Sequence, residues 1–309
     1  MSDVILTKEM VSAASNNAKV EGLVFMRTYT EKPTSDGNNS FLAGTAEALG
    51  AIQFKVWAGP TYDKMNGGTY VGKICKVAGK INDFNNTRSL IIDSVEEYEG
   101  DEYNVGHFLV KKYSPAKLWD SLTNVLRTNV SPEAYEVFEI VINPIVDSFT
   151  EEFAAVNHHD NCVNGLLAHT CKLVKIAQVI KFYPVMQDTV TNDALMVGCA
   201  IHDIGKTLEY NWGTISKEGR FLNHLTLGLN LITPYKDEII ALKGEEFYST
   251  LISVIQQHHG EYGERPKTLA AYLVHVFDAL EAKLTGAQES IENAVGDTIK
   301  VDEFYLKIK

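Results

Sequence analysis

The hydrophobic pattern of this chain changes its period near residue 105, and a fold built from one type of secondary structure cannot accommodate both patterns. Before that point, apolar and polar residues alternate in short runs, as in half-buried strands. Beyond Ser114, apolar residues recur every three or four positions, as in amphipathic helices. Ser114-Pro115 and Ser131-Pro132 each place a capping hydroxyl before a first-turn proline. We therefore expect a β domain over residues 1–104, and linker helices with an all-α domain over residues 105–309.

The β domain is expected to contain five short strands. Turn-rich segments at residues 30–40 and 82–86 separate some of them. Long loops after the first and third strands are typical of a small Greek-key barrel of the OB type. The expected strands are Leu23–Tyr29, Phe41–Glu47, Ala51–Trp57, Gly72–Ile81 and Ser89–Ser94.

One outer face of this barrel is a candidate surface for a single nucleic-acid strand. If Ile52, Phe54 and Val56 fill the core, Lys55 and Trp57 share the outer face of the third strand. A base can stack on the indole while the ammonium contacts a phosphate. Arg27 on the first strand would extend this surface. The alternative is ordinary barrel packing with solvated lysines.

Charge and composition limit the classes of function. The chain has 28 Lys and Arg against 40 Asp and Glu, a net charge of −12, which argues against broad, non-specific nucleic-acid binding. No apolar run approaches the roughly 18–20 residues that cross a bilayer, and the start, Met1-Ser2-Asp3, lacks a secretory pattern. The 4 cysteines form no CxxC pair and are interpreted as reduced thiols. We expect a cytoplasmic protein without a membrane partner, either monomeric or homo-oligomeric.

Histidines and aspartates in the helical half form an ordered set. Each element of the set falls on a separate expected helix, and the adjacent His-Asp pair ends an apolar one. Imidazole and carboxylate together suit manganese, iron, zinc or nickel, whereas an all-oxygen site would favour magnesium or calcium. The set is His169, His202, Asp203, His224, His258, His259 and Asp278.

These residues can be divided between two metal ions. His169, His202, Asp203 and Asp278 would hold one ion. Asp203 would also serve the second ion with His224 and His258, and His259 would be a further ligand or a phosphate contact. Two ions about 3.5–4 Å apart can share a nucleophile and hold the attacked phosphoryl group. Burying Asp203 without a cation would cost several kcal/mol, so the ordered set favours metal ligands over separate structural residues.

Three further residues near this set are candidates. Lys206 follows the His-Asp pair by three positions and would stabilise a phosphoryl oxygen, the alternative being a solvated lysine at a helix end. His158 and His159 would contact a phosphate or cap the preceding helix.

Four segments of the second half resemble those of the YhaM-type 3′–5′ exoribonucleases, in which an OB-type module precedes an HD-domain phosphohydrolase. The segments are Asn164–Thr170, Ile201–Lys206, His258–Gly260 and His275–Lys283. The resemblance implies hydrolysis of single-stranded RNA, or DNA, from the 3′ end to nucleoside 5′-monophosphates. Asp203 and Lys206 would be catalytic, with two divalent ions per chain: manganese first, then magnesium, iron, nickel or zinc as alternatives.

The sequence leaves two alternative functions open. The same chemistry could act on small cyclic or linear oligonucleotides or nucleotides, which the acidic helical half favours. A non-catalytic nucleic-acid-binding protein is the alternative of another class, and the intact ligand set argues against it.

Overall fold

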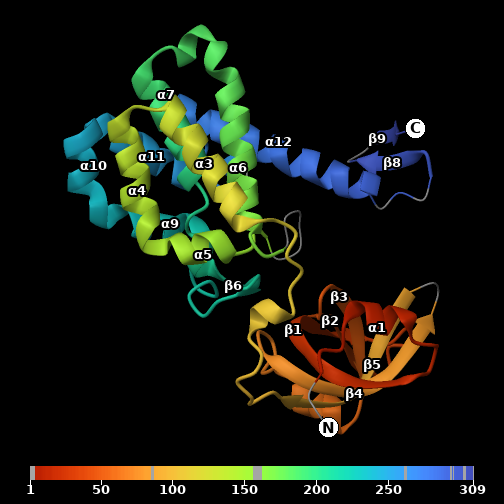
Figure 1. Cartoon of the computed structure of the whole chain (residues 1–309). Coiled ribbons are helices and arrows are strands. Elements are labelled where there is room, and N and C mark those ends of the chain that lie inside the picture. Colours follow the sequence, from red (N-terminus) through yellow and green to blue (C-terminus); the bar gives the residue numbers. More distant parts are fainter. Residues whose placement is uncertain are drawn as a thin grey trace. The chain divides into compact units, whose positions relative to one another are not determined.

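The computed structural model describes residues 4–84, 87–155, 162–260, 263–292, 294, 296–301 and 304–308. The chain divides into two compact units, residues 1–111 and 112–309 (Figure 1). The sequence placed the boundary between residues 104 and 105. Within the described ranges, no helix is both long enough and apolar enough to cross a membrane.

The first unit is a five-stranded barrel, as the sequence predicted. Neighbouring strands pair antiparallel except for β3 and β5, which pair in parallel, and the order β1-β2-β3-β5-β4 closes because β4 pairs with β1. A short helix, α1 (Lys8–Ala13), precedes the strands, and α2 (Pro60–Met65) lies between the third and the fourth. The strands are β1 (Lys19–Pro33), β2 (Ser40–Glu47), β3 (Ala51–Trp57), β4 (Ile74–Phe84) and β5 (Thr87–Glu97).

Strand β3 has the two faces that its alternation predicted. Ile52, Phe54 and Val56 are buried in the barrel core, each at most 2% exposed. The residues between them lie outside, and Trp57 is 48% exposed. The side chains on the outer face of β3 are therefore accessible to a ligand.

Arg27 does not lie on the outer surface, so its predicted role in contacting a nucleic-acid strand is wrong. The pairing of β1 with β2 shifts register between Met26 and Thr28, which places Arg27 at a β-bulge. A bulge redirects the side chain of the extra residue. The Arg27 guanidinium is only 4% exposed and forms an ion pair with Glu47 at 3.2 Å, so it stabilises the barrel.

The second unit is mainly helical. Two short hairpins complete it: β6 (Tyr210–Asn211) with β7 (Thr214–Ile215), and β8 (Thr298–Val301) with β9 (Phe304–Lys307). Its helices are α3 (Pro115–Asn129), α4 (Pro132–Ile142), α5 (Val146–Glu151), α6 (Gly165–Val179), α7 (Thr189–Ile201), α8 (Lys206–Glu209), α9 (His224–Ile232), α10 (Lys236–Lys243), α11 (Glu245–Gln257) and α12 (Leu269–Glu292).

Helix α7 is the central element of this unit. It packs against α4, α6, α11 and α12, and residues 193–201 are all buried. The Asp188 carboxylate caps its first turn by accepting a hydrogen bond from the Thr191 amide. Because α7 is enclosed by other helices, the residues that follow its last turn lie inside the unit.

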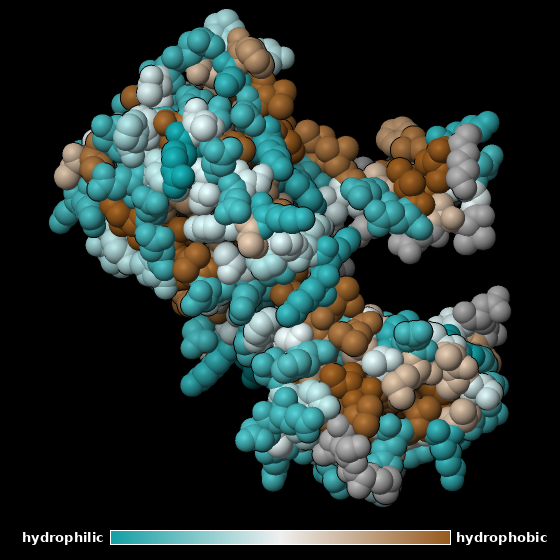
Figure 2. Space-filling view, viewed as in Figure 1, coloured by the Kyte–Doolittle hydropathy of each residue, from teal (hydrophilic) through white to brown (hydrophobic). Residues whose placement is uncertain are grey.

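The end of the chain forms a hairpin beyond α12. Strands β8 and β9 pair antiparallel, and β8 packs against α12. Figure 2 shows apolar surface at this end of the molecule, where Phe304 and Leu306 are exposed.

Candidate metal centre

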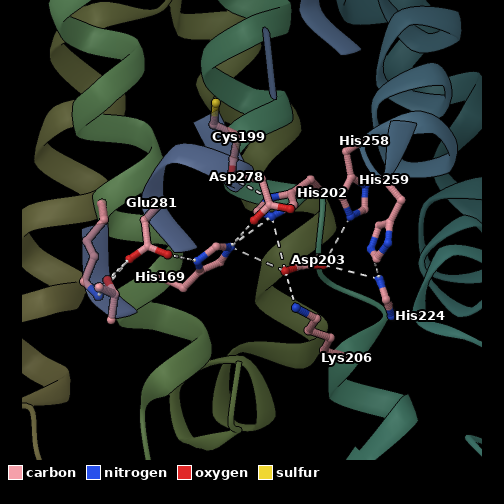
Figure 3. A network of polar contacts seen from close by, with 12 residues as sticks. His169, Cys199, His202, Asp203, Lys206, His224, His258, His259, Asp278 and Glu281 are labelled. Atoms are coloured by element: carbon pink, nitrogen blue, oxygen red, sulfur yellow. Dashed lines mark hydrogen bonds and ion pairs between the residues drawn. The ribbon is translucent and has the colours of Figure 1, made fainter. Parts of the chain in front are cut away.

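The helical unit brings all seven predicted ligands together in two groups (Figure 3). Within each group, one ligand atom from each residue lies within 4.8 Å of the others. The first group is His169, His202 and Asp278, and the second is Asp203, His224, His258 and His259.

The first group joins three helices. His169 lies in the middle of α6, His202 caps the C-terminus of α7, and Asp278 lies on α12. His169 Nε2 is 3.3 Å from His202 Nε2 and 3.2 Å from Asp278 Oδ1. Neighbouring ligands of an octahedral ion are about 3.0 Å apart when the ligand bonds are about 2.1 Å. These atoms therefore need to move little to surround one ion.

The second group forms where α9 begins and α11 ends. His224 is the first residue of α9, and His258 and His259 directly follow α11. The Nε2 atoms of His224 and His259 are 2.8 Å apart. This group contains three imidazoles and one carboxylate, Asp203, a donor set that suits transition metals better than magnesium or calcium.

Asp203 lies between the two groups and offers one oxygen to each. Its Oδ2 is 3.2 Å from His202 Nε2 and 3.6 Å from His169 Nε2. Its Oδ1 is 3.5 Å from His258 Nε2 and 3.7 Å from His224 Nε2. This is the geometry of a bridging carboxylate.

The chemistry of the buried atoms fits a cation. His258 Nδ1 donates to the carbonyl oxygens of Val254 and Ile255, at 3.2 and 3.1 Å, because a carbonyl can only accept. His258 Nε2 then carries a lone pair, and it faces the acceptor Asp203 Oδ1. In the described part of the chain, both atoms are buried without a hydrogen-bond partner. A metal ion between them would satisfy both.

Burial and the neighbouring charges shift the pKa values of these side chains in different directions. Burial lowers the pKa of His258 to about 4, so its lone pair is free at neutral pH. Burial also acts to lower the pKa of His169, but hydrogen bonds to Asp278 and Glu281 outweigh it and raise that pKa to about 9. Lys206 and His202 hold the pKa of the Asp203 carboxyl well below its usual range, against the effect of burial. Without a metal, the first group thus retains a proton as its positive charge.

Gly205 permits the close approach between the turn that carries Asp203 and helix α9, which begins with His224. A β-carbon at this position would overlap the carbonyl oxygen of His224 and lie 2.5 Å from the amide nitrogen of Gly228. Only glycine lets the turn after the His-Asp pair pack this closely on the first turn of α9.

A cavity of about 350 Å³ opens beside the ligands. Lys206 lines it, and its ammonium contacts Asp203 Oδ2 at 2.6 Å, which keeps the lysine beside the two groups. Tyr210 and His275 also line the cavity, and burial raises the pKa of Tyr210 to about 12. Four alanines form the apolar part of the wall: Ala154, Ala155, Ala279 and Ala282.

Glu281 and Glu209, which the sequence did not single out, hydrogen-bond to histidines of the two groups. His169 Nδ1 lies 2.7 Å from Glu281 Oε2, and His224 Nδ1 lies 2.7 Å from Glu209 Oε2. The only available signal was the three-residue spacing from Asp278 to Glu281, which puts both on one helix face. The other two candidates, His158 and His159, lie outside the described residues.

The barrel has its own candidate surface around Trp57. The Phe41 and Trp57 rings are paired across β2 and β3, with centroids 4.9 Å apart. The Lys55 ammonium lies 5.7 Å from the centroid of the Phe41 ring. Phe41, which the sequence analysis did not select, thus extends the predicted pair of Lys55 and Trp57 into a continuous aromatic surface beside a positive charge.

Comparison with known proteins places these observations in a family context. Residues 166–283 match the model of the HD domain family. A protein named 3′-5′ exoribonuclease YhaM from Geobacillus sp. (strain WCH70) is 25% identical over 304 residues, covering 94% of this chain and 89% of that protein. A protein of the same name from Halalkalibacterium halodurans is 24% identical over 301 residues, covering 94% and 90%. These matches confirm the resemblance found in the sequence.

Among solved structures, the S. cerevisiae mitochondrial single-stranded DNA binding protein Rim1 is similar to 28% of this chain. The match covers 100% of that chain, at 13% identity and a TM-score of 0.25.

Proposed function

We propose that this chain, a relative of the YhaM exoribonucleases with an HD domain in its helical unit, is a metal-dependent 3′–5′ exoribonuclease. It would shorten single-stranded RNA, or DNA, and release nucleoside 5′-monophosphates. The observation that carries the proposal is that Asp203 belongs to one ligand group and turns its second oxygen toward the other, so that two ions could lie side by side and hold the attacked phosphodiester between them.

The two groups would hold two divalent ions, with manganese as the first choice. The mixed imidazole and carboxylate donors favour manganese, iron, nickel or zinc over magnesium. When bound, such ions polarise the phosphodiester, promote ionisation of the attacking water and neutralise developing charge.

The surrounding residues would position the substrate. The Lys206 ammonium is placed to neutralise a phosphoryl oxygen next to Asp203. The alanine wall of the adjoining cavity would accept the terminal nucleoside, because its apolar surface can pack against a base and its volume suits one nucleotide.

The barrel would bind the strand upstream of its 3′ end. Stacking on exposed aromatic rings is tolerant of sequence, and a neighbouring lysine can contact the backbone phosphate. Trp57, Phe41 and Lys55 provide both components on one face. A surface of this kind suits an enzyme that removes nucleotides without regard to base.

The proposal is tested with 5′-labelled single-stranded RNAs from two to thirty nucleotides in the presence of Mn²⁺. Long strands should shorten in a ladder, with nucleoside 5′-monophosphates as product. Asp203→Asn should abolish shortening and leave strand binding intact, whereas Asp237→Asn, which changes an exposed carboxylate on α10, should have no effect.

Two outcomes would contradict the proposal. Cleavage restricted to di- to tetranucleotides would favour a phosphodiesterase for small oligonucleotides. Unchanged turnover in Asp203→Asn would reject the two-metal mechanism.

A further inference from the structure

Two histidines, one in each ligand group, have a carboxylate on the ring nitrogen that faces away from the ligands. Glu281 lies behind His169, on the side opposite Asp203 (Figure 3), and Glu209 lies behind His224; each contact is 2.7 Å. Neither glutamate belongs to a ligand group. Each can therefore act on a metal only through its histidine.

The other buried histidine of each group is held differently. His202 Nδ1 donates to the carbonyl oxygen of Cys199 at 3.0 Å, and His258 Nδ1 donates to carbonyls of α11. Each group thus has one histidine oriented by a neutral carbonyl and one oriented by a carboxylate. A carboxylate fixes the ring in the same way and also makes the imidazole a stronger ligand.

Glu281 is held firmly between α6 and α12. Its side chain is 2% exposed, and its second oxygen, Oε1, lies 2.9 Å from Lys172 Nζ and 2.5 Å from Thr285 Oγ1. Lys172 also donates to Thr285 at 2.9 Å. These contacts leave Glu281 one orientation, in which Oε2 faces His169.

Glu209 is in a more open position. It is the last residue of the short helix α8, and its side chain is 13% exposed. Water reduces the electrostatic influence of a carboxylate on a neighbouring imidazole, so the same contact is weaker here than at a buried site.

We propose that Glu281 and Glu209 are positioning residues, each serving one of the two metal sites, and that Glu281 makes the His169 site the tighter of the two. An ionised carboxylate can only accept, so it requires the proton on Nδ1 and presents the Nε2 lone pair to the metal. The proposal rests on the metal sites described under the proposed function.

The test is a calorimetric titration of metal-free, full-length protein with Mn²⁺. The unmodified protein should bind two ions per chain in two separable steps. Glu281→Gln keeps an acceptor of the same shape but removes the charge, and it should weaken the tighter step by about 10–100-fold. Glu209→Gln should weaken the other step, by a smaller factor.

The control is Glu264→Gln, which makes the same change of charge at an exposed carboxylate and should leave both steps unchanged. Circular dichroism of each metal-free variant reports whether it folds. Should Glu281→Gln fail to fold, Glu281→Asp keeps the charge but shortens the reach to His169, and it should also weaken the tighter step.

The possible failures are distinguishable. Two ions bound with unchanged affinity in both glutamine variants would overturn this inference and leave the proposed function intact. Weakening of the looser step by Glu281→Gln would overturn the claim that the His169 site is the tighter one. No ion bound to the unmodified protein would reject the metal sites themselves, whereas two bound ions without RNA shortening would reject only the exoribonuclease.

Discussion

Both units bury charged side chains, but among the described residues it is the helical unit that leaves a buried carboxylate oxygen without a hydrogen-bond partner. In the barrel, Arg27 and Glu47 have opposite charges and meet at 3.2 Å. In the helical unit, the acceptors Asp203 Oδ1 and His258 Nε2 face each other at 3.5 Å. The first arrangement is complete without a ligand, and the second needs a cation. Buried charge therefore indicates a functional site when the groups that converge cannot satisfy one another.

The largest expected effect tests the barrel side of this comparison. Arg27→Met leaves the Glu47 carboxylate buried without its partner, which should lower the free energy of unfolding of the barrel by about 3–5 kcal/mol. Chemical denaturation measures this change. Adding Glu47→Leu should recover most of the loss. Hydrolysis of a short phosphodiester that does not need the barrel should be unchanged under native conditions, and a large loss of that activity would break the comparison.

The next effect concerns Lys206, whose ammonium lies beside the two groups. Lys206→Ala should reduce the rate of RNA hydrolysis by about 10²–10³-fold, because a fixed positive charge near the phosphoryl group is removed. The matched barrel variant, Lys55→Ala, should affect strand binding and not the chemical step. Single-turnover kinetics at saturating RNA separates the two, and equal effects on that rate would contradict the division of roles.

A smaller effect is expected for the aromatic surface of the barrel. Trp57→Ala should weaken single-stranded RNA binding by about 1–3 kcal/mol, the contribution of one stacked base. Fluorescence anisotropy in the inactive Asp203→Asn background measures this. Phe84, 63% exposed on the same unit but outside the Trp57 surface, provides the control as Phe84→Ala. Equal losses in the two variants would show that the Trp57 surface has no special role.

The last effect is a pH dependence confined to the metal-free helical unit. The pKa of His169 is raised to about 9, so the folded unit binds the extra proton more tightly than the unfolded chain. That stabilisation is complete below about pH 6.5 and is lost as the pH rises toward 9. His258 has the opposite sign, because its pKa is lowered to about 4 and stability is lost as the pH falls from 6.5 toward 4.

Thermal unfolding of the metal-free protein should therefore give the highest Tm of the helical unit near pH 6.5. His169→Gln should remove the decline on the alkaline side. If the Tm of the barrel followed the same profile, the pH dependence would not come from the ligand groups.

The sequence predicted the two folds and selected the seven His and Asp residues that the helical unit brings together, because each depends on local pattern. Strand β3 alternates with period two, and the His-Asp pair follows a buried apolar helix. Contacts between segments that are far apart in the sequence could not be predicted from local pattern. The spacing from Asp278 puts Glu281 on the same helix face but does not indicate its partner, His169, which is 112 positions away. A bulge at Arg27 leaves no mark in the hydrophobic alternation. Patterns identify which residues are buried, but pairings across helices depend on how the helices pack.

Gly205 has a consequence for which ions the protein can use. The backbone of the turn after Asp203 contacts the backbone of the first turn of α9. This contact fixes the distance between the backbones of His202 and His224. In the proposed metal sites, exchanging one ion for another of different ionic radius would not be accommodated by sliding these segments. Rotation of carboxylates such as Asp278, whose side chain is 28% exposed, has to absorb the difference in size.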